Sequence, residues 1–378
     1  MFNQKFKLNA KEIHEKAIVI DAHSHPLLQS KIGLVPFDFG IDNPNSQIDF
    51  VKMKKGGVDA VFYPLPLLRD VKDTNPQQTI LDSFLMIQEA VEKYPQLAEI
   101  ARSIEDLKRI HSEGKRAIFL TIEYFFDFSK NTLDLLEKLR KHGTTSIALM
   151  EETLRSENND NTSEVTELSE VGRKIITKMN ELGLIIDITH LPDHLQIAVI
   201  NASTQPVIAS HSNARGICNH SRNIPDDIIK MISDKGGVIM VTFNPGFISD
   251  KYNLTRTKAY EEYKIKEKQL KVEFGDNEEE LEKKLDAIWS EMEPETVSME
   301  ELIDHIDYII NLVGPNHVGI GSDYGGTSPP KGLETAALYP NITTELVKRG
   351  YHEEDIFKIL GKNLYRIIEK GQSFNNIS

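Results

Sequence analysis

Three features of this 378-residue sequence predict an α/β fold, a closed (β/α)8 TIM barrel. Short apolar runs recur eight times, each run ends in polar or turn residues, and segments of helical periodicity separate the runs. Most runs are continuously apolar, as expected for parallel strands that are covered on both faces. Eight alternations favour a closed barrel over an open sheet. No GxGxxG follows the first run, which argues against a dinucleotide-binding fold.

The expected strands are runs of five to eight residues. In chain order they are 17–21, 58–65, 117–123, 145–150, 184–190, 206–211, 237–243 and 317–323. The clearest helix is expected at 297–314, where Ser298 and Glu301 form a capping-box pair and Gly314 ends the pattern. Its apolar stripe consists of Leu302, Ile303, Ile306, Ile310 and Val313.

The whole chain, 1–378, is expected to form one barrel domain with a single insertion. Barrels of this type often reach such a length as one unit. Residues 251–295 are dense in Lys and Glu and predict a charged helical insertion after the seventh strand. The insertion is either a solvated excursion or a lid or dimer contact beside the barrel mouth, because loops on that face carry function.

The net charge and the cysteine content indicate which binding partners and which cellular compartment to expect. The formal net charge is −14 at pH 7, so neither nucleic acid nor an anionic membrane is an expected partner. No run approaches the length of a membrane span, and the N-terminus has no signal-peptide core. Cys218 is the single cysteine, which excludes intramolecular disulfides. These observations predict a cytoplasmic protein; a homodimer is left open.

Side chains that can bind metal gather at the ends of the expected strands. His23 and His25 follow the first strand in the run DAHSHP, and their spacing on extended chain points both imidazoles to one side. Four other strands end in Glu123, His190, His211 and Asp323. In a barrel these ends meet at the carboxyl-end face, where active sites of this fold lie.

The joint pattern indicates a metal centre, although each residue alone has an ordinary structural explanation. A lone histidine at a strand end is usually only hydrogen-bonded, and a lone Glu123 is more often a salt-bridge partner. Six nitrogen and oxygen donors at five strand ends are not explained in that way. The donor set suits Zn²⁺ or another borderline divalent ion, because no thiolate takes part. Six ligands exceed what one open-sided catalytic zinc uses, so two ions are expected.

These residues predict hydrolysis of a small-molecule substrate by a metal-activated water. Two cations bridged by a carboxylate would lower the pKa of a shared water and polarise a substrate carbonyl. Asp323 is expected either to accept the proton of that water and pass it to the leaving amine, or to act only as a metal ligand.

The chain resembles the renal (membrane) dipeptidase family, a peptidase branch of the amidohydrolase superfamily. The stretch PVIASHSNARGICNHSRNIPDD at 206–227 carries the most specific likeness. Further likeness comes from AIVIDAHSHP, LGLIIDITHLPD, HVGIGSDYGG and ILGKNLYRIIE, so that the resemblance covers nearly the whole chain.

The resemblance implies a role for each residue that matches the family pattern. It implies that His23, Glu123 and Asp323 hold one zinc, and that Glu123 bridges to a second zinc held by His190 and His211. It also implies that Arg222 binds the terminal carboxylate of the substrate, for which a planar guanidinium is suited. The alternative for Arg222 is a salt bridge near a helix N-terminus, for instance with Asp226.

One departure from the family concerns the metal ligands. The family usually reads H-x-D at the first strand, whereas this chain has His25 at the third position. The exchange removes one negative charge and leaves Glu123 and Asp323 as the anionic ligands. The cation is therefore expected to be bound less tightly and to be more Lewis-acidic.

Other departures concern the substrate pocket. The family places a carbonyl-polarising histidine where this chain has Glu151, and an ionised carboxylate cannot donate a hydrogen bond to an oxyanion. The glycines that usually follow the bridging Glu are Tyr124 and Phe125, and an acidic residue after the catalytic Asp is replaced by Gly325. Three functions are therefore weighed. The first is a zinc-dependent dipeptidase-like hydrolase, the second a hydrolase of N-acyl amino acids, lactones or other small esters, and the third a catalytically weakened metal- or ligand-binding barrel.

Overall fold

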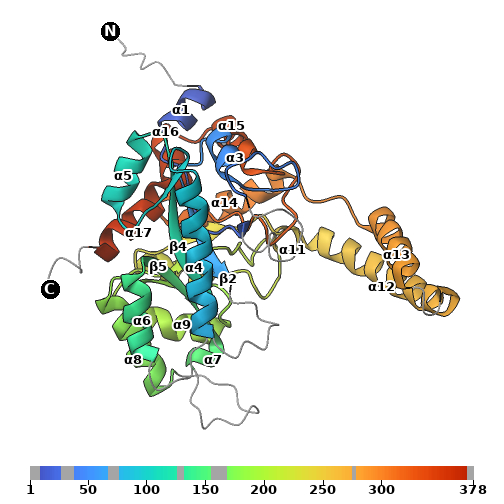
Figure 1. Ribbon diagram of the computed structural model, residues 1–378, viewed down its shortest axis with the longest axis horizontal. Coiled ribbons are helices and arrows are strands. Elements are labelled where there is room, and N and C mark those ends of the chain that lie inside the picture. The colour runs from blue at the N-terminus through green and yellow to red at the C-terminus, as the bar shows by residue number, and fades with distance from the viewer. Residues whose placement is uncertain are drawn as a thin grey trace.

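The computed structural model describes residues 9–26, 38–66, 76–125, 132–154, 168–274 and 278–372. Within these ranges, nine strands form one parallel sheet that is surrounded by helices (Figure 1). The strands are β1 (Ile20–Asp21), β2 (Ala60–Pro66), β3 (Ala98–Ile100), β4 (Arg116–Phe125), β5 (Thr144–Leu149), β6 (Ile185–Asp187), β7 (Ile208–Ala209), β8 (Val238–Val241) and β9 (Val318–Ile320).

The helices connect these strands in turn. The α-helices are α1 (Ala10–Lys16), α3 (Phe50–Lys55), α4 (Pro76–Lys93), α5 (Ile104–Ser112), α6 (Thr132–Lys141), α7 (Glu151–Leu154), α8 (Glu170–Glu181), α9 (Asp193–Ala202), α10 (Asp226–Asp234), α11 (Pro245–Ile248), α12 (Asp250–Phe274), α13 (Glu278–Met292), α14 (Met299–Val313), α15 (Pro340–Lys348), α16 (Glu353–Phe357) and α17 (Asn363–Gln372). In the described part of the chain, no helix is long and apolar enough to cross a membrane.

Eight of the strands close into a barrel, which confirms the predicted fold class. Around the barrel the order is β1, β2, β4, β5, β6, β7, β8 and β9, and β9 returns to β1 by pairing Ile320 with Asp21. Each of the eight expected strand runs overlaps one of these strands. The expected helix at 297–314 is α14, and both hydrogen bonds of the Ser298–Glu301 capping box are present.

One additional strand was not expected from the sequence. β3 pairs with the first residues of β4, from Arg116 to Ile118, whereas β5 joins the same edge of β4 only from Leu120 onward. β3 is three residues long and only partly buried, so it lacks the apolar run by which the other strands are recognised.

The side chains of the barrel strands alternate between two hydrophobic clusters. Phe62, Phe119 and Met240 belong to the smaller cluster, and their strand neighbours Val61, Ile118 and Val241 belong to the larger one. Because successive strand residues point to opposite faces, one cluster fills the barrel and the other packs under the helices. Leu364 and Ile368 of α17 join the smaller cluster and cover the end of the barrel at which the strands begin.

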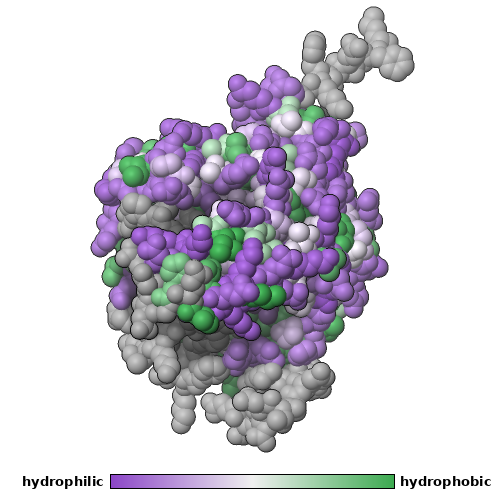
Figure 2. Space-filling view, turned by 90° about the vertical axis from the view of Figure 1, so that its right-hand side faces the viewer, coloured by the Kyte–Doolittle hydropathy of each residue, from purple (hydrophilic) through white to green (hydrophobic). Residues whose placement is uncertain are grey.

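The described part of the charged segment 251–295 consists mainly of two helices, α12 and α13, as the sequence predicts. α12 and α13 pack against each other and form an arm that reaches away from the barrel (Figure 1). The ring of Trp289 on α13 lies 5.9 Å and 5.2 Å from the rings of Tyr260 and Tyr263 on α12, centroid to centroid. Figure 2 views the molecule from the side of the arm, where the coloured surface is mostly hydrophilic.

Candidate metal centre

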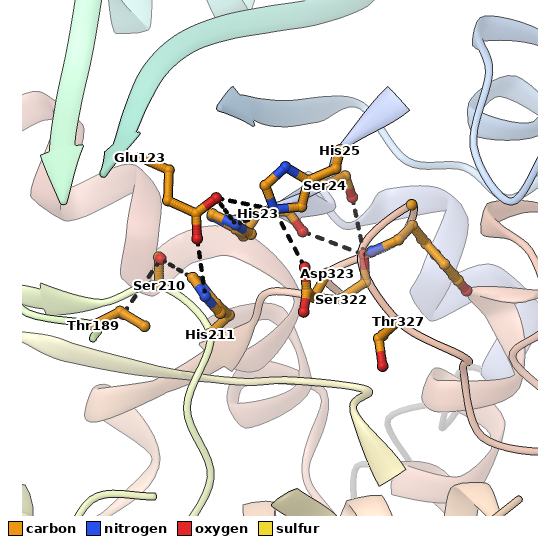
Figure 3. Close-up of polar contacts among 12 residues, drawn as sticks. His23, Ser24, His25, Glu123, Thr189, Ser210, His211, Ser322, Asp323 and Thr327 are labelled. Atoms are coloured by element: carbon orange, nitrogen blue, oxygen red, sulfur yellow. Dashed lines mark hydrogen bonds and ion pairs between the residues drawn. The ribbon is translucent and has the colours of Figure 1, made fainter. Parts of the chain in front are cut away.

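The predicted ligands come together at the carboxyl-end face of the barrel, and Figure 3 labels all of them except His190. His23 and His25 directly follow β1, and Glu123 lies near the end of β4. His190 follows β6, His211 follows β7, and Asp323 follows β9. The eight-strand closure therefore gathers donors that lie up to 300 residues apart in the sequence.

His23, His25 and Glu123 form the first group. The Nε2 atoms of His23 and His25 lie 2.9 Å apart. Both face one oxygen of the glutamate, because Oε2 of Glu123 lies 3.1 Å from His25 Nε2 and 3.6 Å from His23 Nε2. All three side chains are buried. Three donor atoms thus face a common point.

Glu123, His190 and His211 form the second group. The Nε2 atoms of His190 and His211 lie 3.0 Å apart. They face the other oxygen of the glutamate, since Oε1 lies 2.7 Å from His190 Nε2 and 3.6 Å from His211 Nε2. Glu123 therefore presents one oxygen to each histidine pair, which is the arrangement of a bridging carboxylate.

These distances fit a divalent cation in each group. Ligand atoms around a tetrahedral zinc, with bonds of about 2.0–2.1 Å, are about 3.3 Å apart. Burial opposes a charge on Glu123, but His25, His23 and the hydrogen bond with His190 hold its pKa well below the usual 4.5. Burial also opposes a proton on His25, yet the carboxylates of Glu123 and Asp323 raise its pKa to about 10. The two carboxylates thus stabilise a positive charge placed between them. A bound metal ion would supply that charge while the histidines stay neutral.

Asp323 lies at the edge of the first group. Its Oδ1 is 3.4 Å from His25 Nε2. Asp323 and His190 both have left-handed backbone conformations, with φ of 62° and 77°, which residues other than glycine rarely adopt. Such strain persists only where the surrounding structure enforces it, and it commonly marks functional positions.

The glycines after Asp323 allow close packing around this carboxylate. A Cβ on Gly326 would lie 2.5 Å from Asp323 Oδ1, and one on Gly325 would lie 2.2 Å from the carbonyl oxygen of His25. Gly325 also has a φ of 88°. An acidic side chain at 325, as the resemblance would imply, has no room in this backbone arrangement.

Asp21 organises the first group from below, a role that the sequence reasoning missed. Its Oδ1 accepts hydrogen bonds from the backbone N–H groups of His23 (3.1 Å) and Ser322 (2.9 Å). Its Oδ2 accepts from the hydroxyls of Ser24 (2.8 Å) and Ser322 (2.6 Å). Asp21 is fully buried, and this burial raises its pKa. One carboxylate thereby joins the segments that carry His23 and Asp323.

Asp187 has the same role below the second group. Its Oδ1 accepts from the backbone and hydroxyl of Thr189 and from the backbone N–H of Ser210. Ser210 Oγ in turn lies 2.9 Å from Nδ1 of His211, which orients that ring with Nε2 toward Glu123. Asp21 and Asp187 were visible in the sequence as acidic residues in otherwise apolar strand runs, Asp21 at the end of its run and Asp187 inside its run.

Arg222 lies in the loop between β7 and α10. Burial lowers the pKa of His190 and of His211, and the positive charge of Arg222 lowers both further. The alternative partner Asp226 accepts hydrogen bonds from the hydroxyl of Tyr308 at 2.9 Å and 3.0 Å.

Of the remaining predicted pocket residues, the structure describes the side chain of Glu151 but not those of Tyr124 and Phe125. Glu151 begins α7 directly after β5, on the same face of the barrel, and its side chain is half-buried.

Comparison with known proteins places these features in a family. The model of the membrane dipeptidase family, peptidase family M19, matches residues 8–377. Dipeptidase aclJ of Aspergillus oryzae is 28% identical over 342 residues, which cover 86% of this chain and 70% of that protein. Dipeptidase tcpJ of Claviceps purpurea is 26% identical over 353 residues, which cover 88% of this chain and 73% of that protein.

Solved structures share the fold at low sequence identity. The probable dipeptidase PvdM of Pseudomonas aeruginosa superposes with a TM-score of 0.76 at 24% identity and covers 97% of this chain and 98% of its own. A metallopeptidase from Rhodobacter sphaeroides was solved with a phosphinate mimic of the dipeptide L-Ala-D-Ala. It superposes with a TM-score of 0.72 at 20% identity, and the match covers 94% of this chain and 100% of that one. Because the family model matches nearly the whole sequence, the chain belongs to the membrane dipeptidase family, peptidase family M19.

Proposed function

We propose that this protein is a zinc-dependent dipeptidase that cleaves a small dipeptide, or a similar amide, next to a free carboxylate. Its family membership makes it a metal-dependent hydrolase of the dipeptidase type. The observation that carries the proposal is the shared position of Glu123, whose two oxygens face two separate histidine pairs. The two dipeptidase relatives support the substrate class.

In this proposal two zinc ions are held by the two groups. His23, His25 and Glu123, with Asp323 at the edge, would hold one ion, and Glu123, His190 and His211 would hold the other. The imidazole and carboxylate donors suit zinc, which needs no thiolate. When bound, such ions lower the pKa of a water and polarise a substrate carbonyl.

Asp323 is the proposed proton carrier. Its carboxylate accepts the proton that water loses on attacking the carbonyl carbon, and returns it to the amide nitrogen as the C–N bond breaks. Glu123 is ionised at neutral pH, because its pKa is held well below 4.5, and it therefore stays available as a shared ligand. The products are a free carboxylic acid and a free amine.

Glu151 and Arg222 are the proposed substrate-binding residues. A carboxylate at 151 can accept hydrogen bonds from the free amino group of a dipeptide, which an N-acyl amino acid lacks. The guanidinium of Arg222 can hold the terminal carboxylate through two charge-assisted hydrogen bonds.

Replacing Arg222 with Met is expected to lower kcat/KM for a dipeptide by about 10- to 100-fold, since hydrogen bonds to charged groups contribute about 1.5–3 kcal/mol. The same dipeptide with an amidated C-terminus should lose less than about twofold. Kinetics on the substrate pair, with Arg222→Lys as the variant that keeps the charge, measure the difference. Equal losses on both substrates would remove Arg222 from the carboxylate role.

The decisive experiment is elemental analysis of the purified protein, joined to dipeptide hydrolysis assays before and after chelation. Two equivalents of zinc and chelator-sensitive cleavage are the expected result. Two equivalents without dipeptide cleavage would favour N-acyl amino acids, lactones or small esters. Rates no better than those of free metal ions on every substrate would favour a weakened binding barrel. No bound metal after zinc addition would overturn the proposal.

We also propose a homodimer that forms through the arm. Leu254, Ile265 and Val272 are 65%, 60% and 87% exposed, and their spacing places them along one side of α12. α12 carries more basic than acidic residues and α13 more acidic than basic ones, so α12 of one copy complements α13 of a second. The cytoplasmic location, the absence of nucleic-acid and membrane partners and the single-domain organisation stay predictions.

The double replacement Ile265→Glu with Val272→Glu is expected to convert the dimer to a monomer, because it places charge in an apolar contact. Light scattering across a concentration series measures the mass. Val171→Glu, at a position that is 52% exposed on α8, is the matched control and should remain dimeric. A monomeric parent protein, or a dimeric double variant, would exclude the arm contact.

A further inference from the structure

The guanidinium of Arg222 lies over an aromatic ring. Its Cζ atom lies 5.2 Å from the ring centroid of Phe247. Arg222 comes from the loop that follows β7, and Phe247 belongs to α11, which follows β8. The contact therefore joins two neighbouring loops at the mouth of the barrel. A cation over an aromatic face is attracted by the ring quadrupole, and a planar guanidinium can also stack on it.

His220 also lies against this ring. Its centroid is 4.6 Å from that of Phe247, with the planes tilted by 36°. Nδ1 of His220 accepts a hydrogen bond from the backbone N–H of Arg222 at 3.1 Å, which fixes the turn between the two residues. Burial lowers the pKa of His220, and the charges of Arg222 and Arg215 lower it further, so the ring is neutral beside the guanidinium.

The backbone of Phe247 is held by hydrogen bonds that do not involve the side chain of Arg222. Its carbonyl oxygen accepts from the side-chain amides of Asn223 (2.8 Å) and Asn213 (3.3 Å). Asn213 Oδ1 in turn accepts from the backbone N–H of Thr242 at 2.9 Å, and both asparagines are fully buried. Asn213 follows His211 by two residues, so the same network connects the ring to the second ligand group. The ring is thus carried by a fixed backbone segment and packs on His220, so it can hold a long, flexible side chain.

We infer that Phe247 is a positioning residue, which holds the Arg222 guanidinium ready for the carboxylate of the substrate. An unrestrained arginine loses much rotamer freedom when it binds a ligand, and prior contact with the ring removes part of that loss. The side chain of Phe247 has no hydrogen-bond donor and touches no reacting atom; its effect passes through Arg222. The inference rests on the proposed function, in which Arg222 binds the terminal carboxylate.

The test replaces Phe247 with Leu, which keeps an apolar side chain and removes the aromatic face. We expect KM for a dipeptide and the Kd of a phosphinate dipeptide mimic, measured by calorimetry, to rise about 5- to 30-fold, the range that corresponds to a desolvated cation–π contact. kcat and zinc content should change by less than about twofold, and binding of a C-terminally amidated dipeptide should be unchanged. Phe247→Tyr keeps the ring and should behave as the parent protein.

A double-mutant cycle separates positioning from general structural support. If Phe247 acts through Arg222, adding Phe247→Leu to Arg222→Met should weaken the mimic no further. Additive losses, or equal losses on the carboxylate and amide substrates, would overturn the inference. If Arg222→Met weakens carboxylate binding but Phe247→Leu does not, the inference fails while the proposed function stands. If Arg222→Met does not discriminate between the two substrates, both fail.

Discussion

Replacing Glu123 with Gln is expected to lower kcat/KM by at least about 1000-fold and to weaken metal binding in both ligand groups. The carboxylate presents Oε2 to His23 and His25 and Oε1 to His190 and His211, so one substitution removes charge from two sites. A 1000-fold loss corresponds to about 4 kcal/mol of transition-state stabilisation. Elemental analysis of dialysed protein, together with steady-state kinetics, measures both effects.

The matched comparison is His211→Ala, which removes a ligand atom of the second group only, although the ring of His211 also stacks on that of His23 at 3.8 Å, centroid to centroid. This variant should lose one metal equivalent and keep the other, since the first group retains His23, His25 and Glu123. Circular dichroism should show an intact fold in both variants. If Glu123→Gln lost a single equivalent, or His211→Ala kept a full complement, the assignment of Glu123 as the shared ligand would be wrong.

Replacing Asp21 with Ala is expected to destabilise the protein by about 3 kcal/mol and to weaken metal binding by about 10- to 100-fold. The substitution leaves four buried donors without their acceptor, two of them backbone N–H groups of His23 and Ser322. The same carboxylate holds the segments of the first histidine pair and of Asp323 together. Urea unfolding and a competitive chelator titration measure the two losses.

Asp21→Asn provides the control for this prediction. Its amide oxygen can accept from the two backbone N–H groups, and its NH₂ group can donate to the hydroxyls of Ser24 and Ser322. Because burial already raises the pKa of Asp21, a neutral side chain of the same shape should be tolerated. Stability of Asp21→Asn should lie within about 1 kcal/mol of the parent protein. A loss as large as that of Asp21→Ala would show that charge, rather than hydrogen bonding, is what the site needs.

The barrel strands could be predicted because parallel strands covered on both faces leave a recognisable apolar run. β2, β4 and β8 illustrate this, since their described side chains are almost all buried. β3 could not be found in the same way. Its three residues form a strand because β4 begins several residues before it meets β5. The first residues of β4, Arg116 to Ile118, are therefore free to pair with β3. Such pairing depends on distant parts of the chain rather than on local composition.

The sequence also indicated where the donors would gather, because the carboxyl ends of parallel barrel strands meet on one face. It could not show how the donor atoms are distributed between the two ligand groups. The split of the Glu123 oxygens, the edge position of Asp323 and the position of Arg222 over Phe247 depend on side-chain directions that only packing sets. The left-handed backbone at His190 and Asp323 is likewise enforced by neighbours, not by residue type.

The sequence by itself thus determined the barrel, the family and the residue types at the strand ends. These features follow from local patterns of polarity and from short motifs, which the chain carries wherever it folds. The tertiary structure decided which oxygen faces which histidine pair and which buried aspartates hold the ligand segments in place. These features arise from contacts between residues far apart in the chain, such as Asp21 with Ser322, and they exist only after the barrel has closed.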